Sequence, residues 1–242
     1  MATTAIRFEQ VHFEVDGHPL LKEIHANVKA GGITALIGPS GAGKSTLLSL
    51  CNLLRTPTAG HIYVDDKEVR DWDIQVLRQK VGMVFQSPTI FPGTVEDNLA
   101  YGLRLHGKSL ADGVSLLRDV GLSEDLLQQA ADELSGGQKQ RIALGRTLAM
   151  EPQILLLDEV TSALDVHAKQ EVERTILALQ KKINATILWV THDLAQAKRV
   201  AEDVWFMQDG QLVESAPADD FFYAPATSGA KAFLEHMEVT EQ

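Results

Sequence analysis

The stretch Ile33-Thr-Ala-Leu-Ile-Gly-Pro-Ser-Gly-Ala-Gly-Lys-Ser-Thr46 decides the fold of this chain. Its first five residues are mostly apolar, as in a buried strand, and the leucines from 47 to 54 that follow it repeat at helical spacing. Between these segments lies the pattern G-x-x-x-x-G-K-[ST], a glycine-rich turn that joins a strand to a helix. Such a turn wraps closely with its N–H groups pointing inward, at the positive end of the helix. The stretch therefore predicts an α/β protein with a cradle for a polyphosphate.

We expect the whole turn to bind a nucleotide. Lys44 would reach the β- and γ-phosphates and take part in catalysis, and the Ser45 hydroxyl would ligate Mg²⁺ that arrives with ATP. The predicted nucleotide-binding residues are Gly38, Pro39, Ser40, Gly41, Ala42, Gly43, Lys44, Ser45 and Thr46.

A second motif ends another apolar segment. Residues 154–157 are typical of a buried strand, and two adjacent carboxylates, Asp158 and Glu159, follow at its carboxyl end. Open α/β sheets bind their ligands at that end of the strands. Because neighbouring strand residues point in opposite directions, the two acids would have different tasks. We expect Asp158 to hold Mg²⁺ and Glu159 to orient and deprotonate the attacking water.

The remaining segments indicate how this core is completed. Residues 81–85 and 186–190 are also typical of buried parallel strands. The turn signals Asp16-Gly17 and Asp209-Gly210 predict antiparallel hairpins. From 94 to 150 helical spacing replaces the strand pattern. We predict one domain over 1–242: a P-loop NTPase (RecA-like) core of mostly parallel sheet (1–86 and 150–242), an antiparallel β subdomain and an inserted α-helical lobe (87–149).

Composition excludes several classes of protein. The 242 residues include 22 Lys and Arg against 33 Asp and Glu, a net charge of −11, which opposes sequence-independent binding to nucleic acid or to anionic lipid. No strictly apolar run exceeds four residues, whereas a membrane span needs about 20. The N-terminus lacks the pattern of a secretion signal, and Cys51 is the single cysteine. These features favour a reducing cytoplasm and no transmembrane segment.

Residues 134–138, Leu-Ser-Gly-Gly-Gln, followed by Lys-Gln-Arg, resemble the signature motif of ATP-binding cassette (ABC) ATPases. The motif would open a helix and so make a second anion site. The resemblance implies that two cassettes enclose two ATP molecules head to tail, each signature facing the γ-phosphate bound by the other copy. The residues expected at this dimer interface are Ser135, Gly136, Gly137, Gln138 and Asp165.

Three more elements are similar to motifs of the same family. Gln86 resembles the Q-loop glutamine, which contacts Mg²⁺ and links the core to the helical lobe. The run Ser162-Ala163-Leu164-Asp165 resembles the D-loop, which crosses the dimer interface. His192 resembles the switch histidine that contacts the γ-phosphate.

The chain departs from the family pattern at a few positions. Family members usually stack adenine on an aromatic residue near position 15, which is Val15 here, with Phe13 two residues earlier. Both are candidates for the adenine contact, and the sequence leaves open which one makes it. A proline commonly follows the catalytic glutamate, where this chain has Val160, and Gly145-Arg146-Thr147 replaces the usual Ala-Arg-Ala.

The resemblance implies an ATPase subunit that works with a separate membrane permease, cytoplasmic and peripheral on the inner face of the membrane. Residues 87–98, with two prolines and two large apolar side chains, are our candidate for docking that partner. Parts of the chain resemble ATPases of phosphate importers and of iron exporters, so the cargo would be an inorganic ion. The alternatives are a cassette ATPase of DNA repair or translation and a binding module that does not hydrolyse ATP.

Overall fold

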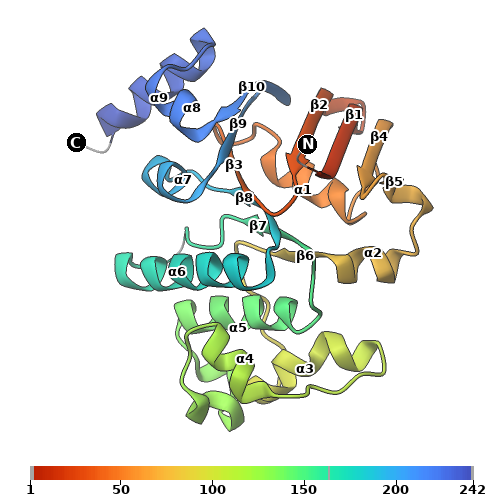
Figure 1. Cartoon of the computed structure of the whole chain (residues 1–242), viewed down its shortest axis with the longest axis vertical. Coiled ribbons are helices and arrows are strands. Elements are labelled where there is room, and N and C mark those ends of the chain that lie inside the picture. The colour runs from red at the N-terminus through yellow and green to blue at the C-terminus, as the bar shows by residue number, and fades with distance from the viewer. Residues whose placement is uncertain (1–2, 163, 241–242) are drawn as a thin grey trace. The chain divides into compact units, whose positions relative to one another are not determined.

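The computed structural model describes residues 3–162 and 164–240. The chain divides into two compact units. The first joins Met1–Arg78 to Thr186–Gln242, and the second is Gln79–Ala185 (Figure 1).

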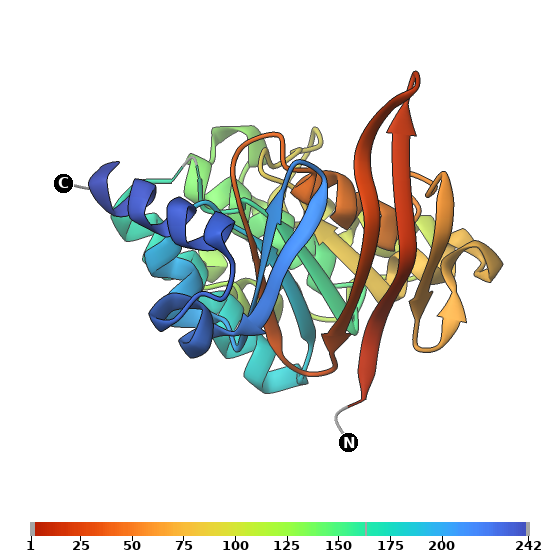
Figure 2. The same ribbon diagram turned by 90° about the horizontal axis from the view of Figure 1, so that it is seen from above.

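The first unit contains an antiparallel sheet in the order β2-β1-β4-β5. Its two long strands, β1 (Thr4–Val15) and β2 (His18–Lys29), run side by side in Figure 2. Asp16 and Gly17 both have positive φ, 52° and 76°, as a type I′ hairpin turn requires. The hairpin predicted at this dipeptide is therefore confirmed. β4 (Ala59–Val64) pairs with β1, and the short β5 (Lys67–Glu68) with β4.

Parallel strands form the centre of the first unit. β3 (Ile33–Ile37) lies between β8 (Thr186–Val190) and β9 (Asp203–Gln208) and is parallel to both. β10 (Gln211–Pro217) returns antiparallel to β9 as the second predicted hairpin. Every residue of β3 and β8 is buried, which explains their continuous apolar sequences. The α1 helix (Lys44–Cys51) follows β3 after the glycine-rich turn.

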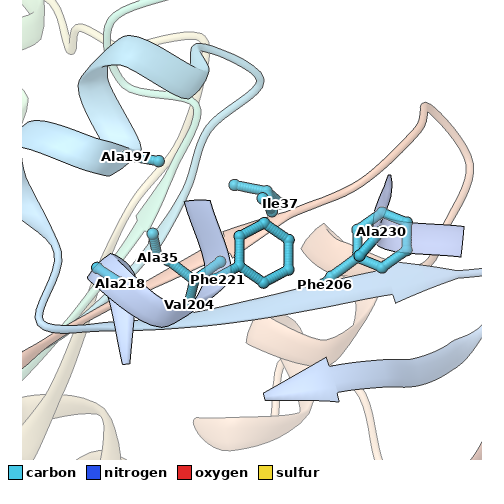
Figure 3. Packing of buried hydrophobic residues seen from close by; sticks show 8 residues of the cluster. All are labelled: Ala35, Ile37, Ala197, Val204, Phe206, Ala218, Phe221 and Ala230. Atoms are coloured by element: carbon cyan, nitrogen blue, oxygen red, sulfur yellow. The ribbon is translucent and has the colours of Figure 1, made fainter. Parts of the chain in front are cut away.

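C-terminal helices cover one face of these strands. Figure 3 shows side chains of β3 and β9 packed against α7 (Leu194–Val200), α8 (Ala218–Tyr223) and α9 (Ser228–Thr240). Phe206 and Phe221 are at the centre of this cluster, with ring centroids 6.3 Å apart. Burial of each ring contributes about 1.5–3 kcal/mol. A short 3-10 turn (Val69–Asp71) and α2 (Ile74–Lys80) lead out of the antiparallel sheet.

The second unit is mainly helical. β6 (Val81–Val84) and β7 (Ile154–Asp158) pair in parallel, and the helical pattern predicted between them is confirmed. The helices are α3 (Val95–Leu105), α4 (Gly113–Asp119), α5 (Gly136–Leu148) and α6 (Val166–Ile183), with 3-10 turns at Glu124–Gln128 and Ala131–Glu133 (Figure 1).

Close packing accounts for two of the sequence departures. A Cβ at Gly145 on α5 would lie 2.9 Å from Leu99 Cδ2 on α3, so glycine lets these helices approach. The Thr147 methyl lies 2.6 Å from the position that a Cβ of Gly82 would occupy, so a larger Thr147 is accommodated by a glycine on β6.

A buried carboxylate fixes the start of α9. Glu214 accepts hydrogen bonds from the backbone N–H groups of Ala226 and Thr227, at 2.8 and 2.9 Å, and from the Thr227 hydroxyl at 2.7 Å. Burial raises the pKa of this carboxyl, but these bonds and the charge of Lys231 outweigh it, so its pKa lies below its ordinary value.

Replacing Glu214 with Gln should lower the free energy of unfolding by about 1–3 kcal/mol near neutral pH, because three partly buried donors lose a charged acceptor. A depressed folded-state pKa means that this contribution is present above the ordinary value of 4.5 and is lost as the pH falls through the folded value. Urea unfolding of parent and variant should therefore show a gap that shrinks on acidification. A gap independent of pH would contradict this account.

Candidate functional site

The glycine-rich turn of the first unit requires glycine at two positions, where φ is positive and a neighbouring element lies close. Gly38 has φ +142°, and a Cβ there would lie 2.0 Å from the carbonyl oxygen of Met207 on β9. Gly43, at the start of α1, has φ +97°, and its Cβ would lie 2.7 Å from Leu21 Cδ2. The turn is therefore pressed against β9 and β2 on its inner side. Its outer rim, Pro39, Ser40, Gly41 and Ser45, is exposed, while Ala42 is buried and Thr46 is half-buried.

The Lys44 ammonium lies within this turn. Its side chain is buried, and Nζ donates to the carbonyl oxygens of Gly38 at 2.8 Å and Pro39 at 2.9 Å. The α1 helix begins at the same residue without a hydrogen bond from a capping side chain. A fixed cation and a helix N-terminus thus face the same turn, an arrangement suited to phosphate oxygens.

The two candidates for the adenine contact differ in exposure. Phe13 is buried, and the Arg55 guanidinium lies 5.6 Å from its ring centroid. Val15 ends β1 opposite His18 and is 42% exposed.

His192 is exposed, and the residues before and after it make hydrogen bonds that fix the local backbone. It follows β8, and the Thr191 hydroxyl before it accepts a hydrogen bond from the Asp193 N–H at 3.1 Å. Asp193 in turn caps α7 by accepting from the Gln196 N–H at 2.7 Å. The backbone on both sides of the histidine is thereby fixed.

The second unit brings together Gln86 and Glu159. Gln86 Nε2 donates to Glu159 Oε2 at 3.0 Å and to the Ser162 hydroxyl at 3.1 Å. β6 and β7 are adjacent and parallel, so their carboxyl ends meet at one edge. Asp158 is the last residue of β7. The sequence predicted Gln86 and Glu159 separately, and their contact could have been inferred only by pairing those two strands.

Glu159 has a strained backbone. Its φ is +47°, a conformation that costs a non-glycine residue about 1–2 kcal/mol. Ser162 holds this turn, because its backbone N–H and its hydroxyl both donate to the Glu159 carbonyl oxygen, at 3.0 and 2.9 Å. The positive φ thus turns the backbone at the residue after β7, while the Gln86 amide holds the carboxylate. Ser162 is a supporting residue to which the sequence analysis assigned no separate role.

The signature segment caps α5. Ser135 Oγ accepts from the Gln138 N–H at 3.3 Å, and Gln138 Oε1 accepts from the Ser135 N–H at 2.9 Å, a reciprocal capping box. A Cβ at Gly137 would lie 3.1 Å from Ala168 Cβ on α6, whereas one at Gly136 would meet nothing within 4 Å in the described chain.

Asp165 caps the next helix. Its Oδ1 accepts from the Ala168 N–H at 2.9 Å at the start of α6. Ala163, in the segment that resembles the D-loop, lies outside the described residues.

The described part of the chain contains no group of three or more His, Cys, Asp or Glu side chains placed to hold a metal. Within residues 3–162 and 164–240, no helix combines the length and apolar character needed to cross a membrane.

Comparison with known proteins identifies the family. The family model described as ABC transporter matches residues 21–162. This chain belongs to the ABC transporter family. It is 45% identical over 235 residues to the ABC transporter ATP-binding protein YjkB of Bacillus subtilis (strain 168), covering 96% of this chain and 94% of YjkB.

Two further relatives carry the names of import systems. The phosphate import ATP-binding protein PstB 2 of Lactobacillus acidophilus is 40% identical over 92% of this chain and 94% of its own length. The methionine import ATP-binding protein MetN of Caulobacter vibrioides is 39% identical over 92% of this chain and 69% of its own length. The ABC chain described here is thus an ATP-binding transporter subunit.

Solved structures confirm the fold class. The cbiO1 protein of Clostridium perfringens, described as part of the ABC transporter complex cbiONQ, superimposes with a TM-score of 0.83 at 29% identity, covering 99% of both chains. The ATP-binding cassette MJ0796, solved as a dimer bound to ADP and Pi after hydrolysis, gives a TM-score of 0.78 at 29% identity, covering 88% of this chain and 98% of MJ0796. The P-loop NTPase fold and the ATPase activity expected of this ABC chain are confirmed.

Replacing Gly38 with Ala should destabilise the chain by about 1–3 kcal/mol and weaken nucleotide binding, because the new Cβ would clash with the Met207 carbonyl at a positive φ. Gly136→Ala is the matched control for stability without nucleotide, since its Cβ meets nothing within 4 Å in the described chain. Thermal unfolding without nucleotide would compare the two variants, and a fluorescent ATP titration would compare Gly38→Ala with the parent chain. Equal melting temperatures for both variants would contradict the geometry.

Proposed function

We propose that this chain forms an ATP-dependent head-to-tail dimer around two Mg-ATP molecules and drives a separate transmembrane permease. The observation that carries the proposal is the set of fixed polar groups: the Lys44 cradle in the first unit and the Gln86–Glu159 pair in the second. Because the chain belongs to the ABC transporter family, we assign both sets of groups to one reaction, the hydrolysis of ATP.

The glycine-rich turn would hold the triphosphate. Backbone N–H groups between Gly38 and Thr46, with the exception of Pro39, which has none, would surround the phosphates. Lys44 would exchange carbonyl contacts for β- and γ-phosphate oxygens. Mg²⁺ belongs to the substrate, and the donors that would meet it are hard oxygens of Ser45, Asp158 and Gln86. Of the two adenine candidates, exposed Val15 offers more apolar surface to a base than buried Phe13.

Glu159 would act as the general base. It would take a proton from a water molecule as the water oxygen attacks the γ-phosphorus, and the bond to the β–γ bridging oxygen would break to release ADP. The proton would then pass to phosphate or solvent. Gln86 supports this role by holding one carboxylate oxygen, and exposed His192 would contact the γ-phosphate.

The surroundings of Gly136 support the proposal of a head-to-tail dimer. No positive φ and no neighbouring atom in the described chain explains a glycine at this position. A residue without a side chain at an exposed helix N-terminus would let a phosphate from a second copy come close to the backbone. Ser135 and Gln138 would contribute through the same helix end, and Asp165 from the start of α6.

A pocket in the second unit supports docking of the permease. Its volume is about 650 Å³. The lining includes six residues of the segment proposed for docking, Pro88, Ile90, Phe91, Pro92, Gly93 and Thr94, together with Gln128, Ala130, Asp132 and Lys139. Buried Asn98 fixes this segment, since its amide accepts from the Phe91 N–H at 2.8 Å and donates to the Phe91 carbonyl at 2.9 Å. A partly apolar, preformed pocket fits a short amphipathic helix of a permease.

The transported substrate would be an inorganic ion, phosphate or a metal. The name of PstB 2 favours phosphate and that of MetN favours methionine, so the names do not agree on one cargo. We place the chain in the cytoplasm, held on the inner face of the membrane by the permease. The alternative is a cassette ATPase of DNA repair or translation, which would not associate with a membrane protein.

Glu159→Gln and Lys44→Ala should separate hydrolysis from binding. Glu159→Gln should bind Mg-ATP, accumulate as a dimer and hydrolyse at least about a hundredfold more slowly, because it loses the general base. Lys44→Ala should lose ATP binding itself. Turnover assays, ATP titration and size-exclusion chromatography with ATP would measure these effects. Undiminished turnover by Glu159→Gln would remove Glu159 from this role.

Purification of the tagged chain from detergent-extracted host membranes would test the permease. We expect an integral membrane protein to co-purify with the parent chain. Ile90→Asp should lose it while ATP turnover by the purified chain persists, because a charge would enter the pocket lining. Recovery of only soluble partners with the parent would favour the alternative function.

A further inference from the structure

Gln140 is a buried polar side chain in the second turn of α5. It is 2% exposed, and its Nε2 donates a hydrogen bond to the carbonyl oxygen of Phe85 at 3.1 Å. Buried amides usually have a specific hydrogen-bond partner, and this one acts on a backbone group 55 residues away in sequence. The bond therefore connects α5 to the segment that follows β6.

The peptide that Gln140 holds is the one immediately before Gln86. The pairing of β6 with β7 ends at Val84, opposite Leu157. The Phe85 side chain is 48% exposed and so does little to anchor the backbone at this point. Because the Phe85 carbonyl and the Gln86 N–H share one peptide plane, a bond to the carbonyl sets the direction in which Gln86 leaves the strand.

The direction in which Gln86 leaves the strand determines whether its amide reaches Glu159. The Gln86 amide reaches both Glu159 Oε2 and the Ser162 hydroxyl within 3.1 Å. If the peptide before Gln86 rotated, a side chain of fixed length would lose one or both contacts. The Glu159 carboxylate would then lose a donor that orients it.

We propose that Gln140 is a positioning residue for ATP hydrolysis, which acts through the Phe85–Gln86 peptide on the orientation of the Glu159 carboxylate. This inference rests on the proposed role of Glu159 as the base. It also gives α5, the helix that begins with the signature segment, a direct connection to the residue that holds the base.

Gln140→Met is the test variant, because methionine keeps the length and volume of the side chain but cannot donate the hydrogen bond. Thr147→Val on the same helix is the matched control. The Thr147 hydroxyl also bonds a β6 carbonyl, that of Met83 at 3.5 Å, and it bonds its own helix at Ala143 O at 3.0 Å. Met83 lies within the strand pairing, so loss of this bond should leave the backbone in place.

In the purified full chain, Gln140→Met should lower kcat about tenfold and raise the KM for Mg-ATP by a smaller factor, because the displaced Gln86 amide loses Glu159 and also moves relative to the Mg²⁺ of the nucleotide. Thr147→Val should stay within about twofold of the parent in both parameters. Thermal melting of each variant would monitor folding. A folded Gln140→Met with the kcat of the parent, or one whose KM alone rises, would overturn the proposal.

A double-mutant cycle tests the route. Gln140→Met should have no further effect on kcat in a Gln86→Ala background, because the residue through which it acts is gone. Independent, multiplicative losses would overturn the proposal even if each single loss were large. If Glu159→Gln retained turnover, the proposed base would be wrong, whereas the coupling between Gln140 and Gln86 would still be measured by this cycle.

Gln140→Glu tests whether another side chain that can donate a hydrogen bond restores activity. Burial favours the neutral carboxylic acid, which can donate to the Phe85 carbonyl, whereas the carboxylate would repel it. The ratio of kcat for this variant to kcat for the parent should therefore rise as the pH falls. A ratio that does not change with pH would contradict a role that depends on donation to this carbonyl.

Discussion

The burial of β3 on both faces and along both edges is the constraint on which the first unit depends. A strand that is paired in parallel on each side has no freedom to shift, so the residue after Ile37 must turn at a fixed place. Met207 of the neighbouring β9 already occupies the space where a side chain at position 38 would go. The glycine-rich turn therefore begins at a residue that has no side chain, because β9 leaves no room for one there.

In the second unit, side-chain hydrogen bonds position the residues after the strands. β6 and β7 form only a short parallel pair, so backbone pairing between the two strands does not extend to these residues. Ser162, Gln86 and Gln140 each bond a group at or beside the strand ends. Local strain at Glu159 persists because several hydrogen bonds determine the same turn.

Much of the fold could be predicted from the sequence, because its signals are local. The strand, turn and helix around Gly38, the hairpin at Asp16-Gly17 and the helical stretch from 94 to 150 all follow from spacing and turn chemistry. The contact between Gln86 and Glu159 could not be predicted in this way, since it depends on which strands are neighbours. The positive φ of Glu159 and the bond from Gln140 to Phe85 depend on tertiary packing, and no periodicity indicates them.

The capping box at Ser135 and the side-chain cap at Asp165 have a consequence for association. Both helix ends proposed to meet a second copy already have fixed backbones in the single chain. A second copy would not have to order these segments, so little conformational entropy opposes contact there. Encounter between two acidic chains would instead be governed by charge, and its rate should depend on ionic strength.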